Sequence, residues 1–336
     1  DLLIRNIRTL HQTRETPEIA LRSSTGLDKV PSIDNAFLRI ENGRISDFGS
    51  MQDCPELRTN DIDLQGEQDV IPGFVDSHTH SVHAASREEE FVYKLEGLDY
   101  REIAARGGGI LNSARKLQAQ TEEELFQRSL SFCNEMIANG TVGLEIKSGY
   151  GLTLPAELKM LRVIQRLKEK LPIPVKATFL GAHALPDAYK SDKSAYLRLI
   201  KEEILPNIEK EGLADYIDIF CEKGFFDAED TRQMIEWGEN CGLKAKIHTN
   251  QFNSIGGIQV AVEKGILSVD HLEVLEEQEI NLLADSKVLP VLLPGAAFFL
   301  RVPMPPARQM IDRDLPLVLA SDFNPGSSPS YSMSTV

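Results

Sequence analysis

Residues 70–80 read Val70-Ile71-Pro72-Gly73-Phe74-Val75-Asp76-Ser77-His78-Thr79-His80, an apolar run that leads into two histidines. Side chains alternate along a β-strand, so His78 and His80 are expected to project to the same side. Two imidazoles on one side can bind one metal ion at about 2.0–2.1 Å. A His-x-His pair alone is weak evidence for a metal site. The apolar run before it strengthens the case, because it predicts a buried strand that delivers both histidines.

Seven further apolar runs follow, and amphipathic helical patterns separate most of them. The eight predicted strands are residues 70–76, 141–146, 175–180, 216–220, 243–247, 267–269, 288–293 and 315–320. Helical patterns cover residues 156–171, 195–205 and 228–239. Eight strand–helix repeats predict the α/β class and a (β/α)8 TIM barrel over residues 69–336. A doubly wound open sheet is the alternative, but no Gly-x-Gly-x-x-Gly motif follows the first strand.

Residues 1–68 differ from the rest of the chain. They contain no long helical pattern, and two alternating segments flank Asn42-Gly43, which predicts a β-hairpin. A small β-rich domain is therefore expected before the barrel.

Charge and cysteine usage exclude several classes of partner. The formal net charge is −15, which argues against a nucleic acid or an anionic membrane as the partner. The same charge would repel an anionic substrate, which would need an arginine or lysine in the site. The four cysteines form no Cys-x-x-Cys pair and the first residues lack the pattern of a signal peptide, so we expect a cytoplasmic protein with reduced thiols.

Five of the seven histidines fall at the ends of predicted strands: His78, His80, His183, His248 and His271. In a barrel all strand ends open onto one face, where active sites lie. These histidines are therefore expected to meet in space.

Asp322 ends the eighth predicted strand. A carboxylate beside imidazoles suits Zn²⁺ or Fe²⁺ and could also accept a proton from water. A helix N-cap is the alternative role for Asp322. Buried structural histidines are the alternative for His183 and His271, and ordinary loop or helix-start positions are the alternative for Tyr150 and Arg87.

Several stretches of the sequence resemble a known family. The stretch from Val70 to His80 looks like the metal-binding opening of the amidohydrolase superfamily. Five further segments are similar to the imidazolonepropionase family within it: residues 145–152, 178–183, 268–272, 292–295 and 321–327. The likeness runs from the first barrel strand to the last residue.

The resemblance implies a hydrolase of carbon–nitrogen bonds in cyclic amides, which converts 4-imidazolone-5-propanoate to N-formimidoylglutamate in histidine degradation. It implies one metal ion per chain, Zn²⁺ or Fe²⁺/Fe³⁺, held by His78, His80, His248 and Asp322. It also implies a homodimer. The substrate contacts that it implies are Arg87, Tyr150, His183, Gln251, Asn324, Gly326 and Ser327.

The chain departs from that pattern in two places. Many relatives have acidic residues where this chain has Asn250-Gln251. Gln251 cannot act as a base, so Asp322 or His271 is expected to carry the proton. Relatives also continue past the eighth strand, so strands that complete the small domain are expected to lie outside this chain.

The expected mechanism is attack of an activated water on the ring carbonyl. Asp322 takes the proton and, with His271, returns it to the departing nitrogen; His183 donates a hydrogen bond to the carbonyl oxygen. Arg87 and Tyr150 hold the propionate. Three alternatives stay open: another amidohydrolase, such as a nucleobase deaminase; a two-metal site that uses Glu222 or Lys223; and a barrel that binds an anionic ring without turnover.

Overall fold

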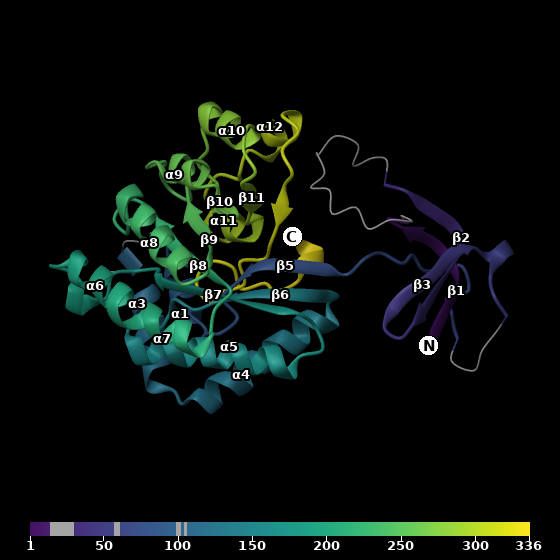
Figure 1. The fold of residues 1–336 in the computed structure, drawn as a ribbon, viewed down its shortest axis with the longest axis horizontal. Helices are drawn as coiled ribbons and strands as arrows, with labels where there is room; N and C mark the ends of the chain where they lie inside the picture. The colour runs from purple at the N-terminus through teal and green to yellow at the C-terminus, as the bar shows by residue number, and fades with distance from the viewer. Residues whose placement is uncertain (14–29, 57–60, 99–101, 104–105) are drawn as a thin grey trace. The chain divides into compact units, whose positions relative to one another are not determined.

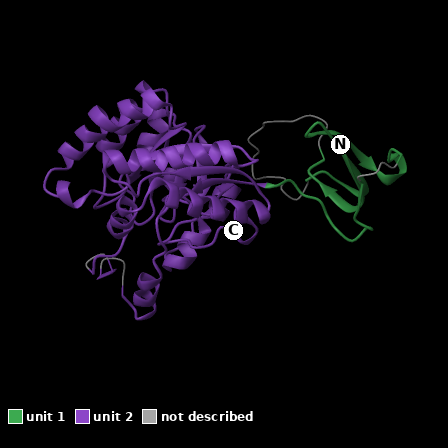
Figure 2. Cartoon of the chain, turned by 90° about the horizontal axis from the view of Figure 1, so that it is seen from below, with its two compact units in different colours: residues 1–73 green, residues 74–336 purple. Residues whose placement is uncertain are grey.

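A computed structural model of the chain describes residues 1–13, 30–56, 61–98, 102–103 and 106–336. The chain divides into two compact units, residues 1–73 and residues 74–336 (Figure 2).

The unit of residues 1–73 contains a four-stranded sheet in the order β3-β2-β1-β4. Its elements are β1 (Leu2–His11), β2 (Ser32–Glu41), β3 (Arg44–Ser50), the 3-10 turn η2 (Met51–Asp53) and β4 (Ile62–Asp63). Asn42 and Gly43 join β2 to β3 with φ of +52° and +72°, as a two-residue turn between antiparallel strands requires. Ile7, Leu10 and Leu38 form part of its small core. The predicted hairpin is confirmed.

The unit of residues 74–336 is built on eight parallel strands that follow one another in sequence order around the sheet (Figure 1). They are β5 (Phe74–Thr79), β6 (Thr141–Lys147), β7 (Val175–Ala182), β8 (Tyr216–Cys221), β9 (Lys244–Thr249), β10 (Ser268–His271), β11 (Leu289–Leu292) and β12 (Val318–Leu319). Backbone hydrogen bonds join the two ends of the sheet: His80 N donates to Phe323 O at 2.8 Å, and Asp322 N donates to His78 O at 3.0 Å. The predicted (β/α)8 barrel is confirmed.

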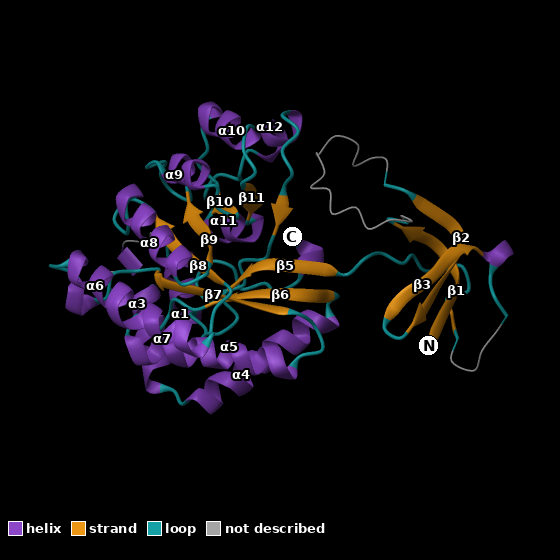
Figure 3. Cartoon of the chain, in the orientation of Figure 1, coloured by secondary structure: helices purple, strands orange, loops and turns teal. Residues whose placement is uncertain are grey.

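Helices connect the barrel strands and surround the sheet (Figure 3). They are α1 (Glu88–Leu95), α3 (Ile110–Ala119), α4 (Glu122–Ala138), α5 (Leu154–Lys170), α6 (Lys193–Leu199), α7 (Leu205–Glu211), α8 (Ala228–Asn240), α9 (Gly257–Lys264), α10 (Glu277–Ala284), α11 (Pro294–Leu300) and α12 (Ala307–Asp312). Short turns of other types are η3 (Asp187–Tyr189), the π-helical η4 (Ile200–Ile204) and η5 (Met333–Thr335). In the described part of the chain, no helix is both long and apolar enough to cross a membrane.

Capping and burial explain where these helices form. Thr121 and Glu124 exchange hydrogen bonds in a capping box at the start of α4, and Asp227 and Asp230 do the same for α8. On α5 one face is buried against the barrel, with apolar residues at helical spacing.

Three elements differ in detail from the prediction. The first barrel strand starts at Phe74, four residues later than predicted. Val70 instead forms a bridge with Leu10, and Pro72, which lacks a backbone N–H, lies between the two segments. The predicted helix over residues 195–205 contains a π turn. Helix α11, which follows β11, lies outside the predicted helical patterns and begins at Pro294, where proline is favoured.

Candidate active site

The predicted site residues gather where the barrel strands end. His78 lies in β5 and His248 in β9, while His271 is the last residue of β10. His80 and His183 each follow a strand directly, and Asp322 comes after β12. All six side chains are buried. This is the face of a barrel on which active sites are built.

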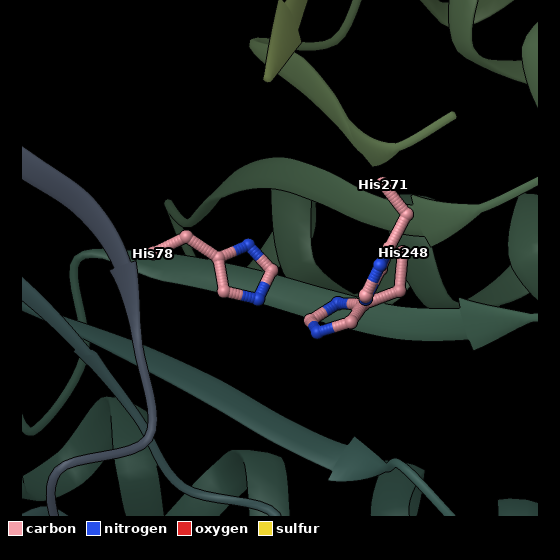
Figure 4. A group of neighbouring side chains, drawn as sticks. All are labelled: His78, His248 and His271. Atoms are coloured by element: carbon pink, nitrogen blue, oxygen red, sulfur yellow. The ribbon is translucent and has the colours of Figure 1, made fainter. Parts of the chain in front are cut away.

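The four predicted metal ligands lie together at this face. Asp322 Oδ1 is 3.4 Å from both His78 Nε2 and His80 Nε2. The ring centroids of His78 and His248 are 4.5 Å apart, and those of His248 and His271 are 5.3 Å apart (Figure 4). In the described part of the chain, two groups of side chains could each hold an ion, His78 with His80 and Asp322, and His78 with His248 and His271. The two groups share His78, so they form one cluster.

The nitrogen atoms of this cluster fit a metal ion. Among the described residues, His78 Nε2 and His248 Nε2 are buried without a hydrogen-bond partner. An unpartnered buried polar atom costs about 1–3 kcal/mol, and a bound cation would use its lone pair. Burial lowers the pKa of His78 and His80 well below the usual range, so both rings are neutral and can act as ligands.

Two aspartates orient the histidines from behind. Asp270 Oδ2 lies 2.6 Å from His78 Nδ1, and Asp218 Oδ2 lies 2.9 Å from His248 Nδ1. With Nδ1 facing the Asp270 carboxylate, the proton of the neutral His78 ring sits on Nδ1 and the lone pair of its Nε2 faces the cluster. Neither aspartate was predicted as a site residue. A sequence signal existed for Asp218, which is the one charged residue in the apolar strand β8.

Two lysines lie beneath these aspartates inside the barrel. Lys147 Nζ is 2.9 Å from Glu145 Oε1 and 2.9 Å from Asp218 Oδ2. Lys246 Nζ is 3.2 Å from Asp270 Oδ2. The group contains four buried carboxylates, those of Glu145, Asp218, Asp270 and Asp322. When all four are ionised, they exceed the two ammonium groups by two negative charges. One divalent cation would balance that difference.

His271 is held by an acidic neighbour and a strained backbone. Its Nδ1 lies 3.2 Å from Glu273 Oε1. Burial alone would lower the pKa of His271, but the carboxylates of Glu273, Asp322 and Asp270 together outweigh burial and raise the pKa to about 8. His271 and Leu272 have φ of +93° and +70°. Such conformations cost about 1–3 kcal/mol each and persist where the surrounding structure enforces them.

His183 has a defined tautomer. Its Nδ1 is 3.1 Å from the Gly149 carbonyl oxygen, which can only accept, so Nδ1 carries a proton. Burial lowers the pKa of His183 well below the usual range, so the ring is neutral and Nε2 is a hydrogen-bond acceptor. The ring also stacks on His80, with centroids 5.3 Å apart.

All of the predicted substrate contacts line one cleft together with the histidine cluster. They are Arg87, Tyr150, His183, Gln251, Asn324, Gly326 and Ser327. Asn324 shapes its own loop: its Nδ2 donates to Asp322 O, and its Oδ1 accepts from the backbone N–H groups of Gly326 and Ser327 at 2.8 and 2.7 Å.

Arg87 is not isolated in this cleft. Its guanidinium forms a buried ion pair with Glu90 at 2.5 Å, three residues further along α1. The sequence did not indicate this partner, because Glu90 is one of three consecutive glutamates at the start of a helix.

The chain is similar in sequence to proteins of known name. The chain is 52% identical over 336 residues to a protein named imidazolonepropionase from Christiangramia forsetii, covering 100% of this chain and 81% of the relative. It is 40% identical over 310 residues to an imidazolonepropionase from Geobacillus kaustophilus, covering 90% of this chain and 73% of the relative. This chain belongs to the imidazolonepropionase family. No family model matches it.

Solved structures with the same fold are more distant from this imidazolonepropionase-family chain. A 5-methylcytosine deaminase from Klebsiella pneumoniae, 14% identical, aligns with a TM-score of 0.71 over 98% of this chain and 77% of its own. An adenosine deaminase from Xanthomonas campestris with bound zinc, 13% identical, gives 0.64 over 100% of this chain and 72% of its own. These likenesses show the shared barrel fold.

This imidazolonepropionase-family barrel does not bring Glu222 or Lys223, the alternative ligands for a second metal ion, into the histidine cluster. The carboxylate of Glu222 accepts hydrogen bonds from the backbone N–H groups of Phe252 and Asn253 at 2.9 and 3.2 Å, and from the Asn253 amide at 2.9 Å. Lys223 is exposed. Glu222 therefore fastens the loop after β9, and neither residue joins the histidine cluster.

Proposed function

We propose that this chain hydrolyses 4-imidazolone-5-propanoate to N-formimidoylglutamate. The observation that carries the proposal is the family membership, with 52% identity over the whole chain to a protein named imidazolonepropionase. The buried cluster of histidines and Asp322, in a cleft that also contains every residue proposed to contact the substrate, supports it.

The proposed metal ligands are His78, His80, His248 and Asp322. Their unpartnered nitrogen atoms and the excess of buried carboxylates support one divalent ion, zinc or iron, since imidazole and carboxylate suit both. When bound, such an ion activates water as a nucleophile and polarises a carbonyl group.

Asp322 is the proposed proton acceptor. Its Oδ1 lies 3.4 Å from two of the candidate ligands, so it stands beside any water that attacks there. His271, whose Nδ1 faces Glu273, is proposed to deliver a proton to the departing ring nitrogen. Gln251 lines the cleft without being able to act as a base, which leaves the proton transfer to these two residues.

For His183 the structure suggests a role different from the one expected from the sequence. Because Nδ1–H donates to Gly149, the Nε2 of the neutral ring accepts. We therefore propose that His183 accepts a ring N–H of the imidazolone and fixes the orientation of the ring. A donor to the carbonyl oxygen would require the cationic form, which burial disfavours.

The remaining contacts are proposed to bind the rest of the substrate. Arg87 and Tyr150 would hold the propionate, while the loop of Asn324, Gly326 and Ser327 would close against it.

We further propose that the protein is cytoplasmic and a homodimer, as the family resemblance implies. Light scattering on the purified chain tests the dimer.

The test is a substrate panel with the purified, zinc-loaded chain. Loss of the imidazolone absorbance, with N-formimidoylglutamate identified by mass spectrometry, is the expected result. Cytosine and adenosine should not react. Deamination of either one without imidazolone hydrolysis would contradict the proposal and favour a nucleobase-deaminase function for this barrel.

A further inference from the structure

Helix α1 places a second cationic side chain, Lys94, in the cleft beside Arg87. Arg87 is the N-cap of α1, and Glu90 and Lys94 are four residues apart and lie on one face of the helix. All three line the same cleft as the histidine cluster. We propose that Lys94 binds the carboxylate of the substrate's tail and makes the site specific for an anionic ligand. This inference rests on the proposed function.

The charge balance of this corner favours Lys94 over Arg87 alone. Arg87 and Glu90 form a buried ion pair at 2.5 Å, and the Glu90 carboxylate also accepts from Gly109 N at 3.0 Å. The pair is neutral as a unit, so it supplies orientation but little net attraction for an anion. Lys94 adds the positive charge. The chain carries a formal charge of −15, so an anionic ligand needs such a local cation.

The ammonium group of Lys94 is held in place and can still donate further hydrogen bonds. Its Nζ donates to Gly326 O at 3.0 Å and lies 4.4 Å from the centre of the Phe299 ring. Within the described ranges, no carboxylate forms a salt bridge with it. An ammonium has three N–H donors, so a ligand carboxylate can be added to these contacts.

Gly326 brings the two cations together. A Cβ atom at Gly326 would lie 2.1 Å from Arg87 Nη1, so the backbone of residue 326 packs directly on the guanidinium. The Gly326 carbonyl meanwhile accepts from Lys94. One carboxylate placed beside this glycine could contact the guanidinium and the ammonium together.

The surroundings of Lys94 disfavour its charged form. Burial, and secondly the charge of Arg87, lower the pKa of Lys94 to about 8. Glu90 acts in the opposite direction but does not offset them. A bound carboxylate would stabilise the charged form, as an opposite charge within a few ångströms does.

The test measures equilibrium binding, which does not depend on turnover. Imidazole-4-propanoate and its uncharged amide, imidazole-4-propanamide, are titrated calorimetrically into the zinc-loaded full chain. The wild-type protein should prefer the carboxylate. Lys94→Met should reduce that preference about 10- to 100-fold, the worth of a hydrogen bond to a charged group. Lys94→Arg should retain most of it.

Lys168→Met is the matched control, because it removes an equal charge from a half-exposed lysine near Asp215. It should leave the preference unchanged. If Lys94→Met weakens both ligands equally, Lys94 only supports the Gly326 loop and the proposal is wrong. An unchanged preference, or equal binding of both ligands by the wild type, also overturns it. Imidazolone turnover by the wild type is assayed separately, so failure of the proposed function is distinguished from failure of this inference.

Discussion

Asp322 combines two properties that a proton acceptor at a metal site needs. It lies 3.4 Å from His78 Nε2 and from His80 Nε2, and it is buried. Its backbone φ of +51° is left-handed, which aspartate tolerates better than most residues. The sequence placed Asp322 at the end of a strand, but the contacts with both histidines come from the closure of the barrel.

Asp322→Asn should abolish turnover and leave the fold intact. The amide keeps the shape of the side chain but cannot accept a proton, so kcat should fall by about 10²- to 10⁴-fold. Steady-state kinetics and thermal unfolding check the two parts. Asp312→Asn, at an exposed position on α12, is the control and should behave like the wild type. Near-normal kcat in the Asp322 variant would mean that another group is the base.

Asp270→Asn should weaken metal binding. The carboxylate faces His78 Nδ1 at 2.6 Å and fixes the tautomer that presents Nε2 to the cluster. Loss of such a partner typically lowers metal affinity by about 10- to 100-fold. Competition with a chromophoric chelator measures the affinity, and circular dichroism verifies the fold. Unchanged affinity in a folded variant would show that Asp270 does not orient His78.

At the scale of elements, helix α5 helps to position Tyr150. Glu157, in the first turn of α5, accepts backbone hydrogen bonds from Gly149, Gly151 and Leu152 at 3.1, 2.8 and 2.8 Å. These bonds hold the loop after β6 in place, including Leu152 with its left-handed φ of +55°. The loop therefore depends on a helix residue that does not line the cleft.

Glu157→Gln should raise KM about 10-fold with a smaller effect on kcat, because a glutamine amide has one acceptor oxygen where the carboxylate has two. The loop that carries Tyr150 would lose at least one of its bonds. Glu169→Gln, exposed in the last turn of the same helix, is the matched control. Equal kinetics for both variants would remove the positioning role of Glu157.

The sequence predicted the elements better than it predicted their contacts. All eight barrel strands were found because apolar runs of this length, separated by helical patterns, have few other solutions. Because all strand ends of a barrel open onto one face, the sequence also predicted that His78, His248 and Asp322 lie close together. The pairing of Arg87 with Glu90 could not be predicted, because neighbouring glutamates have the same local signal. The start of β5 was misplaced because Val70 is apolar in either setting, and only its pairing with Leu10 assigns it.

At the scale of the whole molecule, His83 should make stability depend on pH. It is buried, its ring stacks on Phe132 with centroids 5.0 Å apart, and its Nδ1 lies 2.9 Å from His80 O. Burial lowers the pKa of His83 to about 4. The unfolded chain, with a pKa of about 6.5, binds the proton first as the pH falls. The contribution of His83 to the free energy of unfolding is therefore fully present above pH of about 6.5, and it is lost as the pH falls towards about 4.

His83→Gln tests this dependence. In urea unfolding with a chelator present, the wild type should lose about 2 kcal/mol more than the variant between pH 7 and pH 5. The comparison uses the change with pH, so a constant loss of packing in the variant does not affect it. Parallel losses in both proteins would show that His83 is not the group that titrates.

The most direct test of metal-dependent imidazolone hydrolysis is turnover before chelation, after chelation and after zinc is added back. Freshly generated 4-imidazolone-5-propanoate is the substrate, and its absorbance is followed with the purified full chain. Activity that disappears on chelation and returns with about one zinc per chain is the predicted result, since among the described residues the two groups that could hold an ion share His78. Undiminished turnover by a metal-free, folded chain would contradict the roles given to His78, His80, His248 and Asp322.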